Sequence, residues 1–185
     1  MKITGGYLKG QTLFAPTSKE IRPLRTKIRK SLFDIIGHNL TGFKILDLFC
    51  GTGALGIEAL SRGAEFVVFV DASEKSQKLV LKNLAKFNLL EKARFYKKPL
   101  PQFLSALAKK QVVFDLIFIT PPYLKGLSLK TLENIPKTIL HPSTIIIVEE
   151  HTQVSLPEKT EILTLFKKKI YGETSLWFYS LKDSV

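Results

Sequence analysis

The residues with the clearest capacity for chemistry follow an apolar run that ends in two prolines and a tyrosine, the decapeptide FDLIFITPPY at residues 114–123. Residues Ile117 to Ile119 are continuously apolar and either β-branched or aromatic, which predicts a strand buried on both faces. Because Pro121 and Pro122 cannot donate ladder hydrogen bonds, the chain must leave the sheet there as a stiff loop. Such a loop offers carbonyl groups, the Thr120 hydroxyl and the Tyr123 ring at the carboxyl end of a strand, where open α/β sheets bind ligands. A strand end with a surface tyrosine is the alternative.

A glycine motif lies about seventy residues earlier, in the segment DLFCGTGALG at residues 47–56. The spacing of Gly51, Gly53 and Gly56 matches the dinucleotide fingerprint, in which glycines allow a tight turn and close backbone approach to the ligand. Asp71 follows Gly51 by twenty residues, at the end of the next predicted strand, where an acid can bind ribose hydroxyls. An NAD or NADP enzyme is therefore one candidate.

Asp47 argues against a dinucleotide. A carboxylate directly before the glycines would repel a pyrophosphate, whereas it suits a ligand that carries an ammonium group and a sulfonium. No hydride-transfer constellation follows, and the Pro-Pro-Tyr loop appears instead. An acid before the glycines, Asp71 after the second strand and Tyr123 after the fourth together favour S-adenosylmethionine as the cofactor.

The segments between these motifs alternate between strand and helix patterns. Apolar β-rich runs predict strands at 43–49, 65–70, 93–97, 113–119 and 145–149, and helical spacing predicts helices at 24–37, 54–62, 74–87 and 102–110. Two further strands, 164–171 and 175–181, are close enough to pair antiparallel. We predict an α/β, Rossmann-like fold with a mostly parallel doubly wound sheet and an antiparallel C-terminal strand. A single domain, 1–185, would comprise a hairpin arm and helix (1–40) and a catalytic core (41–185).

The charge of the chain is strongly basic and unevenly distributed. The formal net charge is +12, and residues 1–30 hold eight basic side chains against Glu20 alone. This excess predicts a polyanionic partner, and the arginines favour phosphate contact because the guanidinium fork matches phosphate oxygens. A solvated basic face is the alternative. The candidate RNA contacts are Arg22, Arg25, Lys27, Arg29 and Lys30.

Composition excludes several other classes. Cys50 is the single cysteine, so no disulfide framework is possible and a reducing, cytoplasmic location is expected. We expect no membrane segment or secretory signal, since no apolar run approaches the spanning length. The three histidines lie far apart in sequence, so no metal site is predicted, and Cys50 is interpreted as a small packing residue. The acids that end the fifth strand, Glu149 and Glu150, are interpreted as a solvated strand end.

Taken as a whole, the chain resembles the RsmD family of bacterial methyltransferases. The resemblance is carried by the arm Ile3-Thr-Gly5-Gly6, by Arg22-Pro23, by residues 47–64 and 114–123, and by Tyr171-Gly172-x-Thr174. It implies a class I methyltransferase fold and methyl transfer from S-adenosylmethionine to the exocyclic N2 amine of a guanine in small-subunit (16S) ribosomal RNA. The partner would be ribosomal RNA or the assembling small subunit, and we expect a monomer.

The resemblance also implies roles for individual residues. Those that would hold the cofactor are Asp47, Phe49, Gly51 and Gly53 for its methionine portion, Asp71 for the ribose, and Ala72 for the adenine. Pro99 and Leu100 stand where the family usually has Asp-Ala, so the carboxylate that contacts the adenine amine is missing here. In the family the region of Arg22 and Arg29 also closes over the cofactor, so a structural role or a position beside the cofactor is the alternative to RNA contact for these two residues.

The family's catalytic loop usually begins with Asp, or Asn in relatives, and this chain has Thr120. The implied catalytic residues are Thr120, Pro121, Pro122 and Tyr123. A side-chain oxygen and the Pro121 carbonyl would accept hydrogen bonds from the guanine amine, and Tyr123 would stack on the displaced base. A Thr hydroxyl keeps one acceptor without the charge, so we expect reduced activity. Alternatives are a non-catalytic RNA-binding relative and an enzyme acting on adenine N6 or a protein glutamine.

Overall fold

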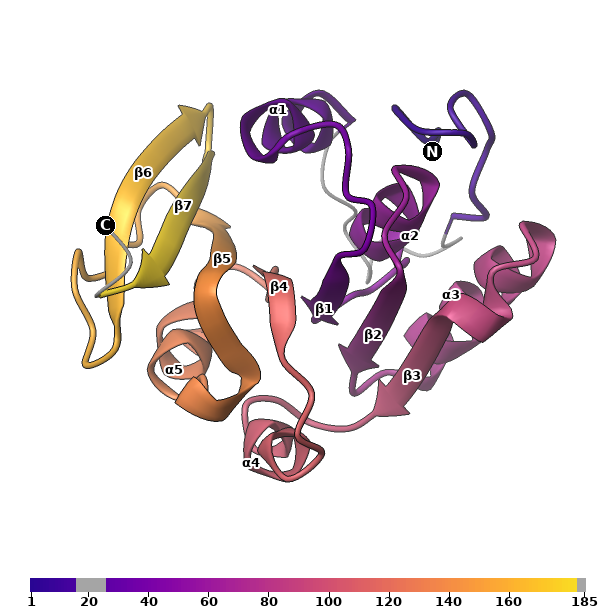
Figure 1. Cartoon of the computed structure of the whole chain (residues 1–185). Helices are drawn as coiled ribbons and strands as arrows, with labels where there is room; N and C mark the ends of the chain where they lie inside the picture. The colour runs from indigo at the N-terminus through magenta and orange to yellow at the C-terminus, as the bar shows by residue number, and fades with distance from the viewer. Residues whose placement is uncertain (16–25, 183–185) are drawn as a thin grey trace. The chain divides into compact units, whose positions relative to one another are not determined.

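The described residues of the computed structural model, 1–15 and 26–182, form two compact units, Met1–Lys98 and Pro99–Val185. The N-terminal arm belongs to the first unit, where Thr4 and Leu8 are hydrogen-bonded to the first helix of the predicted core. The single-domain assignment, with its division at residue 40, stays a prediction. Figure 1 shows the elements of each unit in colours that follow the chain.

The sheet of the first unit is parallel and has the order β3-β2-β1. Its strands are β1 (Lys44–Leu48), β2 (Phe66–Asp71) and β3 (Ala93–Lys97). The helices between them are α2 (Ala54–Ser61) and α3 (Glu74–Lys86), and a short 3-10 turn, η1 (Leu90–Lys92), precedes β3. Strands β1 and β2 are almost continuously buried, as their β-branched and aromatic residues predict. The strand-helix alternation expected from the sequence is confirmed in this unit.

Helix α2 is buried along its whole length. Its inner side meets the sheet so closely that a Cβ atom on Gly56 would lie 2.3 Å from the ring of Phe69. Only glycine fits at this helix–sheet contact, which is the role of the third glycine of the motif. The outer side of α2 carries the polar residues Glu58 and Ser61, and these are covered by the arm.

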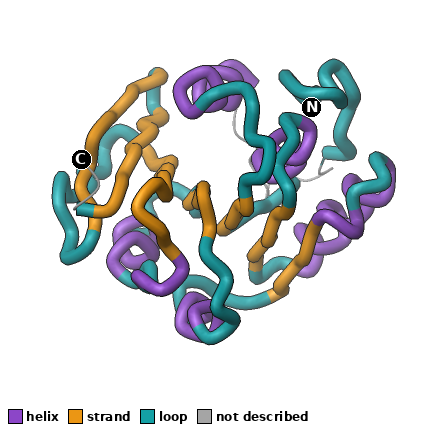
Figure 2. Tube along the Cα trace, viewed as in Figure 1, coloured by secondary structure: helices purple, strands orange, loops and turns teal. Residues whose placement is uncertain are grey.

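The N-terminal arm forms a hairpin-like loop with an isolated antiparallel bridge between Lys2 and Thr12. Figure 2 shows it as loop rather than strand. At its tip, Gly6 has a φ of +73°, and a Cβ atom there would lie 1.8 Å from the Ser61 carbonyl oxygen, so glycine is required for conformation and for space. The helix that follows, α1, comprises Thr26–Ile36, and its predicted beginning at residue 24 lies outside the described residues.

The second unit contains a four-stranded sheet in the order β4-β5-β7-β6. Its strands are β4 (Phe114–Ile119), β5 (Leu140–His151), β6 (Leu163–Tyr171) and β7 (Thr174–Leu181). Its helices are α4 (Phe103–Ala108), α5 (Leu127–Glu133) and the 3-10 turn η2 (Lys137–Ile139). Strands β4 and β5 are parallel, whereas β7 runs antiparallel to both β5 and β6. The predicted antiparallel pair at the end of the chain is confirmed.

Two features of the second unit differ from the prediction. Strand β5 begins at Leu140, five residues earlier than predicted, because the ladder with β4 is irregular there and tolerates Pro142. The Thr144 hydroxyl donates to the Phe114 carbonyl at 2.6 Å within this irregular stretch. Helix α5 was not predicted, since its seven residues are too few to show helical periodicity clearly.

Candidate functional site

The turn between β1 and α2 is built from left-handed residues at alternate positions. Phe49, Gly51 and Gly53 have φ values of 57°, 52° and 72°, and the Gly53 amide donates to the Cys50 carbonyl at 2.7 Å. Two of the three are glycine, for which this conformation carries little strain, and Phe49 is the exception. The turn thereby brings backbone close to the position after β1 where the sequence predicts a cofactor.

Asp47 lies beneath this turn with only 1% of its surface exposed. Its Oδ2 atom accepts a hydrogen bond from the Gly56 amide at 3.0 Å, whereas Oδ1 has no hydrogen-bond partner among the described residues. Burial raises the pKa of Asp47 to about 7, against the opposing effect of the Gly56 hydrogen bond. A buried carboxylate oxygen with unused acceptor capacity fits a ligand that brings a hydrogen-bond donor, such as the ammonium group of S-adenosylmethionine.

Asp71 connects the end of β2 to the same turn. Its Oδ2 atom accepts from the Gly51 amide at 2.9 Å, and its Oδ1 atom accepts from the Ser73 amide at 2.8 Å. Each carboxylate oxygen has a second lone pair, so ribose hydroxyls can also be accepted. Ala72, the predicted neighbour of the adenine, is exposed beside it. These two predicted cofactor residues therefore lie with the glycine turn in the first unit.

Cys50 lies within this turn and is buried. Burial raises the pKa of its thiol well above the ordinary value, and the nearby charges of Asp47 and Asp71 raise it further. A thiol that stays protonated is a weak nucleophile. The interpretation of Cys50 as a packing residue is consistent with these surroundings.

Pro99 and Leu100, the predicted adenine contacts, belong to the second unit. Leu100 is buried and Pro99 is exposed. The Pro99 carbonyl accepts a hydrogen bond from the Phe103 amide at 3.2 Å, where α4 begins. Their contact with a cofactor stays a prediction.

The Thr-Pro-Pro-Tyr loop leaves β4 at Ile119, as predicted. Pro121 is buried, Pro122 is exposed, and Thr120 and Tyr123 are partly exposed. The Tyr123 hydroxyl donates to Glu149 and lies 3.1 Å from the Thr174 hydroxyl oxygen. Its ring makes an edge-type contact with His151, with 6.0 Å between the centroids. The position of the tyrosine ring is thus set by strands β5 and β7.

Glu150 holds the loop from the other side of β5. It is fully buried and accepts hydrogen bonds from the Leu124 amide at 3.2 Å and from the Ser128 hydroxyl at 2.7 Å. Glu149, bound to Tyr123, is 7% exposed. The interpretation of both acids as a solvated strand end is wrong, since their carboxylates anchor the loop and the start of α5. The signal was a pair of acids at the end of a strand otherwise predicted to be buried.

The predicted RNA contacts differ in their surroundings. Arg22 and Arg25 lie outside the described residues, and Lys27 and Lys30 are exposed on α1. Arg29 is 0% exposed; its Nε atom lies 3.2 Å from Glu58, and it donates a further hydrogen bond to the Lys2 carbonyl. The structure therefore supports the structural alternative for Arg29, because a guanidinium buried in this way cannot reach RNA phosphates without unfolding the arm.

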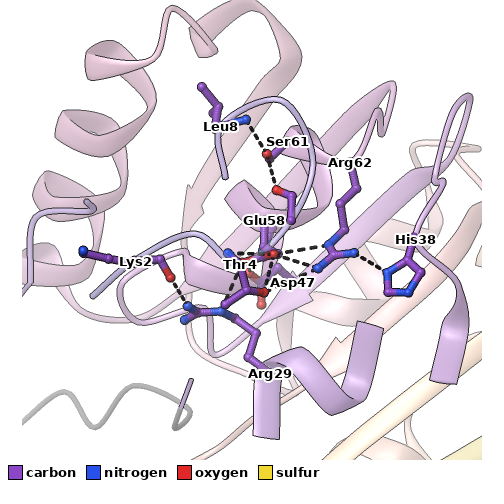
Figure 3. Close-up of polar contacts among 11 residues, drawn as sticks. Lys2, Thr4, Leu8, Arg29, His38, Asp47, Glu58, Ser61 and Arg62 are labelled. Atoms are coloured by element: carbon purple, nitrogen blue, oxygen red, sulfur yellow. Dashed lines mark hydrogen bonds and ion pairs between the residues drawn. The ribbon is translucent and has the colours of Figure 1, made fainter. Parts of the chain in front are cut away.

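Glu58 on α2 is the centre of the network that holds Arg29 (Figure 3). It also accepts hydrogen bonds from the Thr4 amide and hydroxyl and from Arg62. Arg62 in turn donates to the His38 Nδ1 atom at 2.9 Å. One carboxylate thereby ties the arm and α1 to the helix that follows the glycine turn.

The described residues contain no cluster of three or more His, Cys, Asp or Glu side chains that could hold a metal ion. Over the same residues, none of the helices is both long and apolar enough to cross a bilayer.

Comparison with known proteins identifies the family. The family model described as "Conserved hypothetical protein 95" matches residues 1–180. The chain belongs to this family. It is 37% identical to "Putative rRNA methyltransferase YlbH" of Bacillus subtilis, over 97% of this chain and 98% of that protein. It is 29% identical to "Ribosomal RNA small subunit methyltransferase D" of Escherichia coli K12, over 97% of this chain and 89% of that protein. The predicted RsmD resemblance is confirmed.

Solved structures show the same fold. "Putative methyltransferase yhhF from Escherichia coli" superposes with a TM-score of 0.84 and 28% identity, over 98% of this chain and 97% of that one. A putative methyltransferase, SMU.776, solved in complex with SAH, superposes with a TM-score of 0.67 at 16% identity, over 84% of this chain and 48% of that one. The predicted class I methyltransferase fold is confirmed for this family member.

Proposed function

We propose that this chain transfers a methyl group from S-adenosylmethionine to the exocyclic N2 amine of a guanine in small-subunit ribosomal RNA. The observation that carries the proposal is the anchored Thr-Pro-Pro-Tyr loop, in which Glu149 and Thr174 bind the Tyr123 hydroxyl. Full-length similarity to proteins named rRNA methyltransferases supports an RNA substrate. The guanine N2 target rests on the family resemblance.

The glycine turn of the first unit supports binding of the cofactor, which supplies an electrophilic methyl group when bound. The Oδ1 atom of Asp47, to which no described residue donates a hydrogen bond, would accept one from the ammonium group of the cofactor. The Asp71 carboxylate oxygens would accept hydrogen bonds from the ribose hydroxyls, through the lone pairs that do not bind the Gly51 and Ser73 amides. The hydrogen bonds from the Gly51 and Ser73 backbone amides also keep the Asp71 carboxylate oriented before a ligand arrives, which lowers the entropic cost of binding.

The loop of the second unit would hold the nucleophile. A guanine amine is a weak nucleophile because its lone pair is delocalised into the ring. Hydrogen bonds accepted by the Thr120 hydroxyl and the Pro121 carbonyl would orient the amine, and positioning of this kind supplies much of a rate enhancement. The Tyr123 ring, fixed through its hydroxyl, would stack on the displaced base. The amine proton leaves after methyl transfer, when the nitrogen has become acidic, so Thr120 need not act as a strong base.

Methyl transfer from labelled cofactor tests the proposal directly. The substrates are undermethylated small-subunit RNA, free and in assembled subunits, and digestion to nucleosides identifies the product. We expect label in N2-methylguanosine. Absence of label from both substrates contradicts the proposal, and label in N6-methyladenosine replaces the guanine target with adenine.

A second candidate is a non-catalytic RNA-binding relative, favoured by Thr120 and Pro99 in place of acids. Titration calorimetry separates it from the enzyme. A chain that binds RNA but not S-adenosylmethionine would support this candidate, whereas cofactor binding at micromolar concentration would favour the enzyme.

A further inference from the structure

The outermost strand of the second unit, β6, exposes basic and apolar side chains together. It follows β7 at the end of the strand order, and residues 166–170, FKKKI, are all exposed. Phe166 is 48% exposed and Ile170 is 60% exposed. Figure 1 shows β6 beyond β7 at the yellow end of the chain. None of the sequence motifs described above includes residues 166–170.

The register of the sheet assigns Lys168 to one face. Lys168 is opposite Trp177 on β7, and its ammonium group lies 3.8 Å from the centre of the indole ring. Trp177 donates to the Ser175 hydroxyl, and Ser175 is opposite Glu150 on β5. Glu150 binds Ser128 of α5. Lys168 therefore shares the face of the sheet on which α5 packs.

Lys167 and Lys169 lie on the other face, because side chains alternate along a strand. They are opposite Phe178 and Leu176 on β7. Leu176 is in turn opposite Glu149 on β5, whose carboxylate holds the Tyr123 hydroxyl. The two lysines thus share a face with the acid that anchors the loop.

The end of this row meets the loop itself. Tyr171, two residues beyond Lys169, is opposite Thr174, and the Thr174 hydroxyl oxygen lies 3.1 Å from the Tyr123 hydroxyl oxygen. Lys167, Lys169 and Tyr171 form a continuous row along β6 that ends beside the anchor of Tyr123. We call these three residues the β6 row.

The charges of the row are available to a ligand. Within the described residues, neither Lys167 nor Lys169 has an acidic side chain at ion-pair distance. Lysines are common on edge strands, where they prevent pairing with other chains. That explanation does not account for Phe166, whose exposed ring packs at 6.2 Å from Phe178 beside the lysines. Alternating cations and an exposed ring are instead typical of surfaces that track a single-stranded nucleic acid.

We propose that the β6 row and Phe166 bind the RNA segment next to the methylated nucleotide, with the lysines on phosphates and Phe166 against a base. The inference rests on the proposed function, since it takes the RNA to be the substrate held at Tyr123. The surface belongs to the second unit, whereas the arm and α1 belong to the first.

Fluorescence anisotropy with protein-free small-subunit RNA tests this surface without requiring turnover. The test variant is Lys167→Ala/Lys169→Ala. We expect its Kd to rise about tenfold at 0.1 M salt, and the slope of log K against log salt to fall by about 1.4, for two lost phosphate contacts on a single strand. Phe166→Ala should raise Kd with an unchanged salt slope, because a stacked ring carries no charge.

Two controls remove the effect of net charge alone. Lys130→Ala/Lys137→Ala removes the same charge from exposed residues of the same unit, on α5 and before β5. Lys168→Ala removes one charge from the opposite face of β6. Both should change Kd less than twofold. The proposed RNA contact is overturned if Kd and the salt slope are unchanged in the test variant. It is also overturned if the test and control variants change equally.

The methylation assay separates this inference from the proposed function. If Lys167→Ala/Lys169→Ala methylates RNA and binds it with the affinity of the parent chain, the proposed RNA-binding surface is refuted and the proposed function is not. If the parent chain methylates no RNA but its RNA affinity depends on the β6 row, the proposed function is refuted and the RNA-binding surface is not. If Lys167→Ala/Lys169→Ala binds protein-free RNA normally and loses methylation only of assembled subunits, the β6 row contacts a ribosomal protein, and the proposed RNA contact is overturned.

Discussion

Thr4 in the arm donates hydrogen bonds from both its backbone amide and its hydroxyl to the Glu58 carboxylate on α2, with the hydroxyl oxygen 2.7 Å from Oε1. The same carboxylate faces the guanidinium groups of Arg29 and Arg62. Two buried cations therefore depend on one acid, and α2 begins directly after the glycine turn. The arm is thereby connected to the turn that is predicted to bind the cofactor.

Glu58→Gln should destabilise the chain strongly. The substitution keeps the shape of the side chain but leaves two buried guanidinium groups without a counter-charge, and breaking a buried pair costs about 3–5 kcal/mol. Urea unfolding followed by circular dichroism measures the change, and the midpoint should fall well below that of the parent chain. Glu91→Gln, at an exposed acid in η1, is the matched control and should leave the midpoint unchanged. Equal midpoints for both variants would contradict the role of Glu58.

Asp47 predicts a dependence of stability on pH. Its pKa is about 7 in the folded chain and about 4 when exposed, so folding takes up a proton between these values. The favourable contribution is complete below pH about 4 and is lost as pH rises through about 7. At one pKa unit per 1.36 kcal/mol the full loss is about 4 kcal/mol, as an order of magnitude.

Asp47→Asn isolates this contribution. The amide oxygen can still accept from the Gly56 amide, and the side chain cannot ionise. The difference in unfolding free energy between Asp47→Asn and the parent chain should therefore shift in favour of the variant from pH 4 to pH 8. A difference that stays constant over this range would show that Asp47 is ionised with an ordinary pKa.

Neighbouring residues of α1 should give opposite phenotypes. Lys27→Ala/Lys30→Ala removes two exposed charges, so RNA affinity and its salt slope should fall while the unfolding midpoint stays within error. Arg29→Ala should instead lower the midpoint, because it leaves Glu58 with one fewer buried partner. Anisotropy titrations and urea unfolding on the same preparations check both expectations. If the Arg29→Ala variant is fully stable but loses RNA binding, Arg29 contacts RNA and its structural role is contradicted.

The contrast between Lys27 and Arg29 shows what the sequence could and could not predict. The glycine turn and the Pro-Pro-Tyr loop were predicted because their conformations are set locally, by left-handed residues and by prolines. The burial of Arg29 depends on Glu58, and the anchoring of Tyr123 depends on Glu149, residues that lie 29 and 26 positions away. Partners at such distances are set by packing, which periodicity does not reveal.

Tyr123→Ala should abolish methyl transfer, whereas Tyr123→Phe should retain part of it. The phenylalanine keeps a ring for stacking but loses the hydroxyl that binds Glu149 and Thr174, so the ring is less well fixed. Stacking is worth about 1–3 kcal/mol per base, and the alanine variant also loses the positioning of the amine, so we expect at least a hundredfold fall in kcat/KM. Single-turnover assays at saturating cofactor measure both variants. An unchanged rate in Tyr123→Ala would refute the stacking role.

Thr120→Asp should raise the rate of methyl transfer, and Thr120→Val should lower it. Aspartate adds a charged acceptor for the amine hydrogen bonds, and charge-assisted hydrogen bonds are about twice as strong as neutral ones. Valine keeps the volume of threonine but removes its acceptor, so the amine loses one of its two proposed partners. We expect changes of about tenfold in opposite directions, since 1.36 kcal/mol corresponds to a factor of ten. Cofactor affinity, measured by calorimetry, serves as the control and should be equal in the three proteins. If the valine variant matches the parent rate, the Thr120 hydroxyl takes no part in holding the amine, and the Pro121 carbonyl is left as the proposed acceptor.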